Sequence, residues 1–282
     1  MPASLLLFLP LALQFGPALP RTDLPEPRKP RYEAPAPATP PPAATTRETD
    51  CLVLARSDPP AAIDFAESWQ AEAQSMTERA AQQHCLGMAA AALDRWDDAE
   101  EAFLSARDST PANERANRAR LGTLAGNAAL ARGSADRALT TLDVAHSDAL
   151  GGEDPRLAGE IAIDRARALV ALGREADAAG ALAEARAGTP KNAQGWLLSA
   201  TLSRRQGKLG EAQGQIEQAA ELLPVDPEIG LEAGVIAALA GRDEAARKSW
   251  LSVIRAAPDS AIAKTAQSYL DQLGPQAASP GR

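Results

Sequence analysis

Large aromatic side chains are scarce in this sequence: Trp, Tyr and Phe together make up 4% of its 282 residues. The chain therefore has few bulky groups with which to fill one thick core. Alanine is abundant instead, which favours helices that pack closely along small residues. The 45% hydrophobic and 23% charged content is ordinary for a globular protein.

The sequence also lacks an excess of basic residues. Its formal net charge is -8, and because acidic and basic residues cancel over the first 50 positions, the whole acidic excess lies on residues 51–282. Binding of nucleic acid depends on clustered Lys and Arg, so this balance argues against nucleic acid as the main partner. Direct binding to an anionic membrane surface is disfavoured for the same reason.

Groups that carry catalysis or hold metals are few. The two histidines, His84 and His146, lie 62 positions apart, and with the two cysteines they do not supply the closely spaced ligands of a zinc site. The sequence contains no glycine-rich phosphate loop, nucleophile elbow or HExxH pattern. The four acids between Asp97 and Glu101 fall at a predicted helix start, where we expect them to face solvent. We therefore predict no catalytic residue, no metal, no cofactor and no enzymatic activity.

The first 20 residues have the character of an export signal. Their apolar run, Leu5 to Leu13, is about as long as a signal-peptide core and well short of the roughly 20 residues that span a bilayer. No basic residue precedes Arg21, and no good small-x-small cleavage site follows the run. Two interpretations stay open: a signal peptide or membrane leader of a periplasmic or cell-envelope protein, and the tail of a cytoplasmic one.

Residues 21–49 are predicted to be a disordered, Pro-rich linker, because prolines recur densely up to Pro42. Proline lacks an N–H group and fixes φ, so such a stretch cannot join a helix or the interior of a sheet. An extended polyproline spacer is the expected conformation.

The rest of the chain is repetitive. Five times, an Ala is followed four positions later by a large apolar residue and seven positions later by a small one: Ala99–Phe103–Ala106, Ala138–Leu142–Ala145, Ala178–Leu182–Ala185, Ala212–Ile216–Ala219 and Ala246–Trp250–Val253. The leading alanines are spaced by 39, 40, 34 and 34 residues. Offsets of four and seven place the three side chains on one stripe of a helix, where small residues let a neighbouring helix approach. In four units a Pro then ends the helix: Pro111, Pro190, Pro224 and Pro258.

A second turn precedes each leading Ala by five residues. It carries Asp94 in the first unit and Gly in the others, at Gly133, Gly173, Gly207 and Gly241, where Gly would cap an earlier helix. A further small residue lies one helical stretch upstream, at Gly87, Gly126, Ala166, Ala200 and Gly234. Each unit is therefore predicted to be a pair of antiparallel helices joined by a tight turn.

These units resemble the tetratricopeptide repeat (TPR). The first matches best, with Leu86-Gly87, Ala99, Phe103, Ala106 and Pro111, and the fourth opens with Trp196, where the family often has Trp. Five units in phase, with two spacings at the family's 34 residues, carry the resemblance over about Met76–Pro258. It implies an all-α fold, an α-α superhelix or right-handed solenoid of antiparallel helix pairs. It also implies a scaffold that binds a protein or peptide partner.

We accordingly assign residues 76–258 to five TPR-like repeats and 50–75 to an incomplete leading hairpin, with Asp58 at a helix start. Residues 259–274 are predicted to form a capping helix, and 275–282 a disordered tail. One face of the capping helix carries Ile262, Ala266, Tyr269 and Leu273. Units two and three contain five or six additional residues, predicted as longer helices or as the loop around Gly151–Pro155.

The two cysteines, Cys51 and Cys85, have two interpretations. If the protein is exported, we expect a disulfide that ties the leading segment to the first repeat. The alternative is a pair of buried thiols that act as small hydrophobic residues.

In the TPR family the first helix of each pair lines a concave groove. Transferred by repeat phase, this implies a partner-binding groove made by Arg120, Asn127, Arg167, Gln194, Leu197, Thr201, Arg204, Arg205 and Leu231. Because Arg binds carboxylates through two N–H groups at once, we expect an acidic peptide or a C-terminus as the ligand. The alternative is that these arginines pair with neighbouring acids or stay in water.

A second functional hypothesis also stays open, in which the protein is an accessory or substrate-binding component of an envelope polysaccharide or peptidoglycan-related complex. A sugar-binding groove would need exposed aromatic side chains. The Trp residues here are mostly assigned to packing between helices, so the protein-binding scaffold is preferred.

Overall fold

The computed structural model describes residues 46–274, which form thirteen helices and no strand. The helices are α1 (Thr46–Ser57), α2 (Pro59–Gln70), α3 (Met76–Ala92), α4 (Trp96–Ser109), α5 (Arg115–Ala131), α6 (Ala135–Gly151), α7 (Pro155–Ala171), α8 (Glu175–Gly188), α9 (Ala193–Arg205), α10 (Leu209–Leu222), α11 (Pro227–Leu239), α12 (Asp243–Ala256) and α13 (Ala261–Leu273). The predicted leader, most of the linker and the tail lie outside the described residues. Since α1 begins at Thr46, the linker prediction is wrong for its last four residues.

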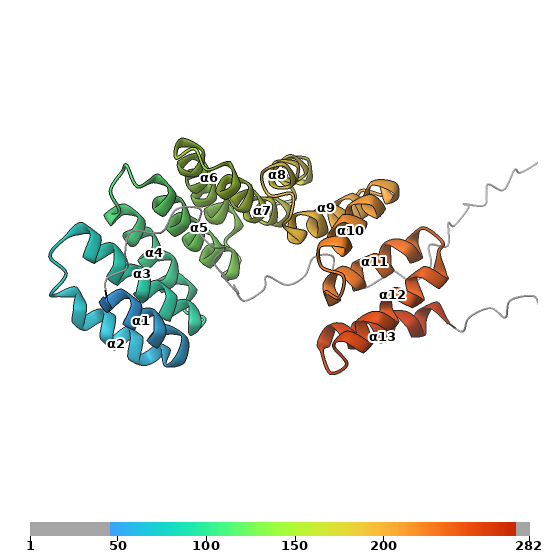
Figure 1. Ribbon diagram of the computed structural model, residues 1–282, viewed down its shortest axis with the longest axis horizontal. Helices are drawn as coiled ribbons and strands as arrows, with labels where there is room; N and C mark the ends of the chain where they lie inside the picture. The colour runs from blue at the N-terminus through green and yellow to red at the C-terminus, as the bar shows by residue number, and fades with distance from the viewer. Residues whose placement is uncertain (1–45, 275–282) are drawn as a thin grey trace, which may run out of the picture.

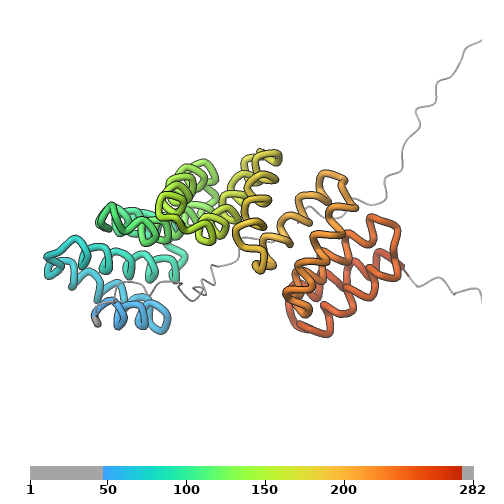
Figure 2. The backbone as a smooth tube through the Cα atoms, turned by 45° about the horizontal axis from the view of Figure 1, so that its top comes forward, coloured from blue at the N-terminus to red at the C-terminus, as the bar shows by residue number. Residues whose placement is uncertain are grey.

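The helices are arranged as an arch of stacked pairs (Figure 1). Each helix packs against the next one along the chain, and from α5 onward each odd-numbered helix also contacts the next odd-numbered one. The odd-numbered helices therefore form one layer and the even-numbered helices another, with α6 and α8 above α5 and α7 in Figure 1. Figure 2 shows that the helix axes rotate from pair to pair. The predicted all-α superhelix of antiparallel helix pairs is confirmed.

The repeat signature is a packing rule between the two helices of a pair. The large residue of the second helix lies directly against the small residue of the first. A Cβ atom added to Gly126 would be 2.6 Å from Leu142 Cγ, and one added to Gly234 would be 2.1 Å from Trp250 Nε1. Leu142 and Trp250 are buried because Gly leaves this space.

The turn within each pair has a left-handed residue at its centre. Asp94 has φ 57°, and the equivalent Gly133, Gly173, Gly207 and Gly241 have φ between 69° and 83°. In each turn the next N–H donates to a carbonyl five residues earlier, as Lys208 does to Ser203 at 2.9 Å. This Schellman geometry ends the first helix and reverses the chain. The prediction that Asp94 stands in place of a turn Gly is confirmed.

The additional residues of units two and three lengthen helices. The helices α5, α6 and α7 each have 17 residues, whereas α8 to α12 have 13 or 14. The first of the two interpretations is thus correct. The connection between α6 and α7 remains short, and Glu153, with φ 57°, lies in the left-handed region there.

Both ends of the described array are covered. At the front, a disulfide joins Cys51 of α1 to Cys85 of α3, with both side chains fully buried. At the back, Tyr269 of α13 packs beside Trp250 with 5.3 Å between ring centroids. The other side of α13 is polar and exposed, as expected of a terminal helix. No helix of residues 46–274 combines the length and apolarity needed to cross a membrane.

Candidate binding surface

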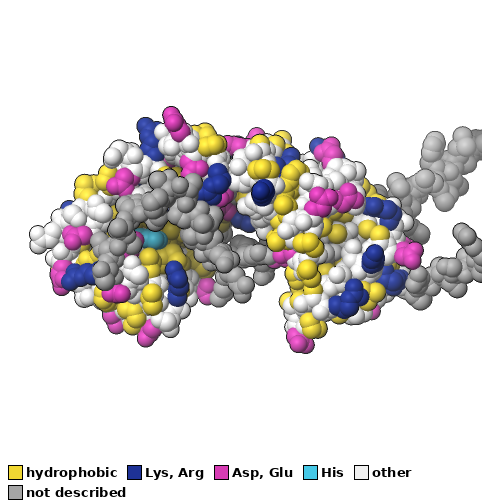
Figure 3. All heavy atoms as spheres, viewed as in Figure 1, with side chains coloured by type: hydrophobic (Ala, Val, Ile, Leu, Met, Phe, Trp, Pro, Cys, Tyr) yellow, Lys and Arg dark blue, Asp and Glu magenta, His cyan; other side chains and the backbone are white. Residues whose placement is uncertain are grey.

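The predicted groove residues come from one layer of the arch. They lie on α5, α7, α9 and α11, the odd-numbered helices of successive pairs. In the space-filling view the outline is indented between the two ends of the arch (Figure 3). Acidic and basic side chains are interspersed over the face shown. The layer of odd-numbered helices, which we call the inner layer, thus brings residues from four repeats along one surface.

Two predicted contact residues are in the core instead. Leu197 is 3% exposed and Thr201 is 2% exposed, and the Thr201 hydroxyl donates to the Leu197 carbonyl at 3.1 Å. The helix that carries them, α9, packs against α7, α10 and α11. Their assignment as ligand contacts is therefore wrong in this conformation, because repeat phase gives a direction but not the distance to the neighbouring helices. Leu231 and Gln194 are half-buried and keep accessible surface.

Three of the predicted groove arginines have carboxylate partners. Arg204 pairs with Glu232 at 2.6 Å, and both side chains are largely buried. Arg205 pairs with Glu175 at 3.1 Å. Arg167 pairs with Asp164. For these three arginines the alternative interpretation, pairing with neighbouring acids, is correct.

Asn127 belongs to the same set of contacts. Its side-chain amide donates to the Asp164 carboxylate at 3.0 Å, and Arg167 binds the other oxygen of that carboxylate. Asp164 is buried, so its charge is held by these two groups from α5 and α7. The hydrogen bond from Asn127 therefore joins two repeats, while Arg167 pairs with Asp164 within α7.

Arg120 differs from the other groove arginines. Its guanidinium donates to the Asn117 side chain at 3.2 Å, and within residues 46–274 no carboxylate is within ion-pair distance of it. Glu160 on α7 interacts with the charge of Arg120 from farther away and pairs with Arg156 at 2.5 Å. The charges of Arg120, Arg156 and Asp154 thus all act on this carboxylate where α5 and α7 meet, a place that we call the α5–α7 junction.

Burial raises the pKa of Glu160 and the charge of Asp154 adds to this, while the charges of Arg156 and Arg120 offset it only in part. Arg120 is therefore a half-buried guanidinium without a carboxylate at ion-pair distance among residues 46–274, and it attracts an anionic group more strongly there than on an open surface. Sequence reasoning missed Glu160 and Arg156. The signal for Glu160 was available, since it lies 40 residues after Arg120, the same interval as between the leading alanines of those units.

The acids at the start of α4 correct another prediction. Glu100 is 2% exposed and pairs with Arg132 at 3.0 Å and Arg137 at 2.8 Å, so it does not face solvent. Asp97 also pairs with Arg132. The two arginines come from the next repeat, so these acids connect repeats. Across residues 46–274 no group of three His, Cys, Asp or Glu side chains is arranged to hold a metal ion.

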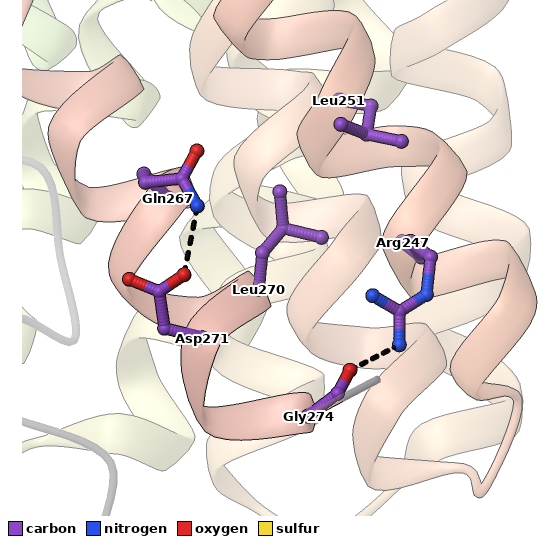
Figure 4. Close-up of a pocket in the computed structure, with 6 residues that line it drawn as sticks. All are labelled: Arg247, Leu251, Gln267, Leu270, Asp271 and Gly274. Atoms are coloured by element: carbon purple, nitrogen blue, oxygen red, sulfur yellow. Dashed lines mark hydrogen bonds between the residues drawn. The ribbon is translucent and has the colours of Figure 1, made fainter. Parts of the chain in front are cut away.

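A hollow of about 500 Å³ lies between α12 and α13 (Figure 4). Its polar groups already bind each other: Arg247 donates to the Gly274 carbonyl at 2.7 Å, and Gln267 donates to Asp271 at 2.8 Å. Leu251 and Leu270 form the apolar part of its lining. Because these polar groups are already engaged with one another, we do not assign a ligand to the hollow.

Comparison of the sequence with protein-family models and with curated proteins gives no match. Solved structures do match. PilW, a type IV pilus biogenesis factor, superposes with a TM-score of 0.62 at 18% identity, over 79% of this chain and 100% of PilW. Pseudomonas aeruginosa pilF has a TM-score of 0.59 at 15% identity, over 79% and 97%. YrrB, a TPR protein with an unusual peptide-binding site, has a TM-score of 0.51 at 17% identity, over 72% and 96%.

The stacked antiparallel pairs make the chain an α-helical repeat protein, in which each unit buries its apolar stripe against its neighbours. Within that class, its turn geometry and its structural neighbours give it the tetratricopeptide-repeat fold.

Proposed function

We propose that this protein is a non-enzymatic scaffold that binds an acidic segment of a protein or peptide partner on its inner layer, with the α5–α7 junction as the anchor. The fold supports a protein-interaction role, because an open array of repeats presents a long surface. The observation that carries the anchor is Arg120, a half-buried guanidinium with no carboxylate at ion-pair distance among residues 46–274. Arginine binds a carboxylate through two N–H groups.

Charge reversal tests the anchor. The probe is a set of fluorescent decapeptides with three Glu residues at varied spacing, each paired with a Gln analogue. We expect some Glu peptides to bind and their Gln analogues to bind at least about tenfold more weakly. Arg120→Glu should reduce that binding about tenfold or more. Binding should also weaken with added salt.

The matched control is Arg174→Glu. Arg174 lies in the turn before α8 and pairs with Asp177 on an exposed surface, so this variant makes the same change of net charge away from the junction. Equal loss of binding in both variants would show that net charge alone attracts the peptide. Unchanged binding in Arg120→Glu would remove the α5–α7 junction from the proposal.

We also propose that the protein is exported to the periplasm or cell envelope. The buried disulfide between Cys51 and Cys85 supports this, because such bonds form and persist in oxidising compartments. Mass spectrometry of the mature protein tests it. Loss of about 20 N-terminal residues together with the mass deficit of two protons is the expected result. A full-length chain with free thiols would contradict export.

A further inference from the structure

Three successive repeats carry a basic residue at the same position. Arg107, His146 and Arg186 each follow the leading Ala of their unit by eight residues. Arg107 pairs with Asp108 at 2.8 Å, and His146 contacts Glu184 at 2.5 Å. The first two of these basic groups therefore have a carboxylate partner within the chain.

Arg186 has none. Its guanidinium donates to the hydroxyl of Ser199 and lies over the ring of Trp196, 5.4 Å from the centroid. In the part of the chain that the structure describes, no carboxylate is within ion-pair distance of Arg186, and Glu211 acts on it only from farther away. Arg186 is half-buried, so its charge is partly removed from water, and this burial lowers its pKa.

The aromatic and hydroxyl partners are themselves fixed. The Trp196 indole N–H donates to the Pro190 carbonyl at 2.9 Å, and the Ser199 hydroxyl donates to the Gly195 carbonyl at 2.7 Å. The plane of the guanidinium is thus held by two anchored side chains from the first half of α9. A guanidinium has five N–H donors, and Ser199 takes only one of them.

This place is separate from the inner surface. At about 100° per residue, Trp196 and Ser199 project from the opposite side of α9 to Gln194 and Arg205. Arg186 comes from the last turn of α8, where the chain passes from one repeat to the next. The inference therefore does not depend on the α5–α7 junction.

We propose that Arg186 and Trp196 form a second binding site, which takes a carboxylate of a partner peptide, either an acidic side chain or a C-terminus. The bound carboxylate supplies the acidic partner that Arg107 and His146 have within the chain. A half-buried cation without an acid is unfavourable, so a ligand carboxylate relieves that cost. The fork of remaining N–H donors favours a planar, two-oxygen acceptor, and an adjacent apolar ligand side chain can contact the exposed part of the Trp196 ring.

Nuclear magnetic resonance of the full chain, with the Trp196 indole N–H as the reporter, tests this site. Three N-acetylated pentapeptides serve as probes: one with a free C-terminus after Leu, one with a C-terminal amide and an internal Glu, and one with a C-terminal amide and Gln. We expect at least one carboxylate peptide to shift the Trp196 resonance in a saturable way below about 10 mM. The carboxylate peptide that binds more tightly identifies whether the site takes a C-terminus or an acidic side chain.

The matched pair of variants is Arg186→Met and Arg107→Met. Both remove a guanidinium from the same repeat position, but only Arg186→Met should weaken binding, by about tenfold or more. Arg186→Lys keeps the charge, loses the fork and should also weaken binding, and it serves if Arg186→Met does not fold. Equal binding of the Gln peptide, tighter binding of inorganic phosphate, undiminished binding by the Arg186 variants, or no shift with any peptide would overturn the proposal.

Discussion

Gly126 offers the sharpest test of how the helix pairs are held together. An Ala at this position in α5 would place its Cβ 2.6 Å from Leu142 Cγ and 2.7 Å from Leu142 Cδ2. Leu142 is fully buried and cannot move freely. Overpacking of this kind costs about 1–3 kcal/mol, while the change from Gly to Ala in a helix contributes about 1 kcal/mol of stability. We therefore expect Gly126→Ala to lower the free energy of unfolding by up to about 2 kcal/mol.

The control is Gly180→Ala, a helical Gly in α8 with no atom within 4 Å of the added Cβ. It should raise the free energy of unfolding by up to about 1 kcal/mol. The difference between the two variants, about 1–3 kcal/mol, then isolates the contact with Leu142. Urea unfolding followed by circular dichroism measures it, and hydrogen exchange in α5 and α6 detects local opening.

A double variant closes the test. Leu142→Ala alone removes the clashing atoms but costs about 2–5 kcal/mol through the cavity it leaves. In combination with Gly126→Ala, the two losses should be less than additive by about 1–3 kcal/mol, because the added methyl group occupies part of that cavity. Equal stability of Gly126→Ala and Gly180→Ala, or strict additivity in the double variant, would refute the packing rule.

Three further outcomes are expected. Replacing Cys51 and Cys85 by Ser should lower the stability of α1 to α3 by about 4 kcal/mol, which is the chain-entropy estimate for a separation of 34 residues. Hydrogen exchange measures this loss, and a loss spread evenly over all helices would contradict the prediction. Gly207→Ala should cost about 1 kcal/mol in urea unfolding because φ is 75° and nothing crowds the site; no cost would show that the turn can rearrange. The pKa of Glu78 lies below its ordinary value because the Ser75 backbone N–H and hydroxyl donate to its carboxylate. The ionised carboxylate therefore stabilises the fold at pH above its unfolded pKa, and this contribution is lost as the pH falls. Glu78→Gln should therefore show a smaller loss of urea midpoint below about pH 4.5, and an unchanged acid limb would contradict the capping role.

The fold was predictable because its signals are local. The stripe in which a large residue lies between two small ones, as in Ala138, Leu142 and Ala145, depends only on helix geometry, and the left-handed turn at Asp94 depends only on where a helix must end. For the additional residues of units two and three, the sequence left two alternatives, longer helices or a longer loop. It could not decide between them, because such residues fit a helix or a loop equally well.

The binding surface was predicted less well than the fold. Arg120 has no carboxylate at ion-pair distance within the described residues and so stays a candidate ligand contact, whereas Leu197 is buried and Arg204 is paired with Glu232. Repeat phase assigns a side chain to one face of its helix. It cannot tell whether that face meets water, a neighbouring helix or an acid from another repeat.

The number of helix pairs, their turns and the direction in which each side chain leaves its helix were predictable, because they follow from residue spacing within one unit. The contacts between side chains of different units became visible only in the folded chain. Glu100 contacts Arg137 across a gap of 37 residues, Asn127 contacts Asp164 across the same gap, and Arg186 meets Trp196 and Ser199 rather than an acid. Such contacts depend on the distance and rotation between neighbouring pairs, which are set by the packing of many side chains at once.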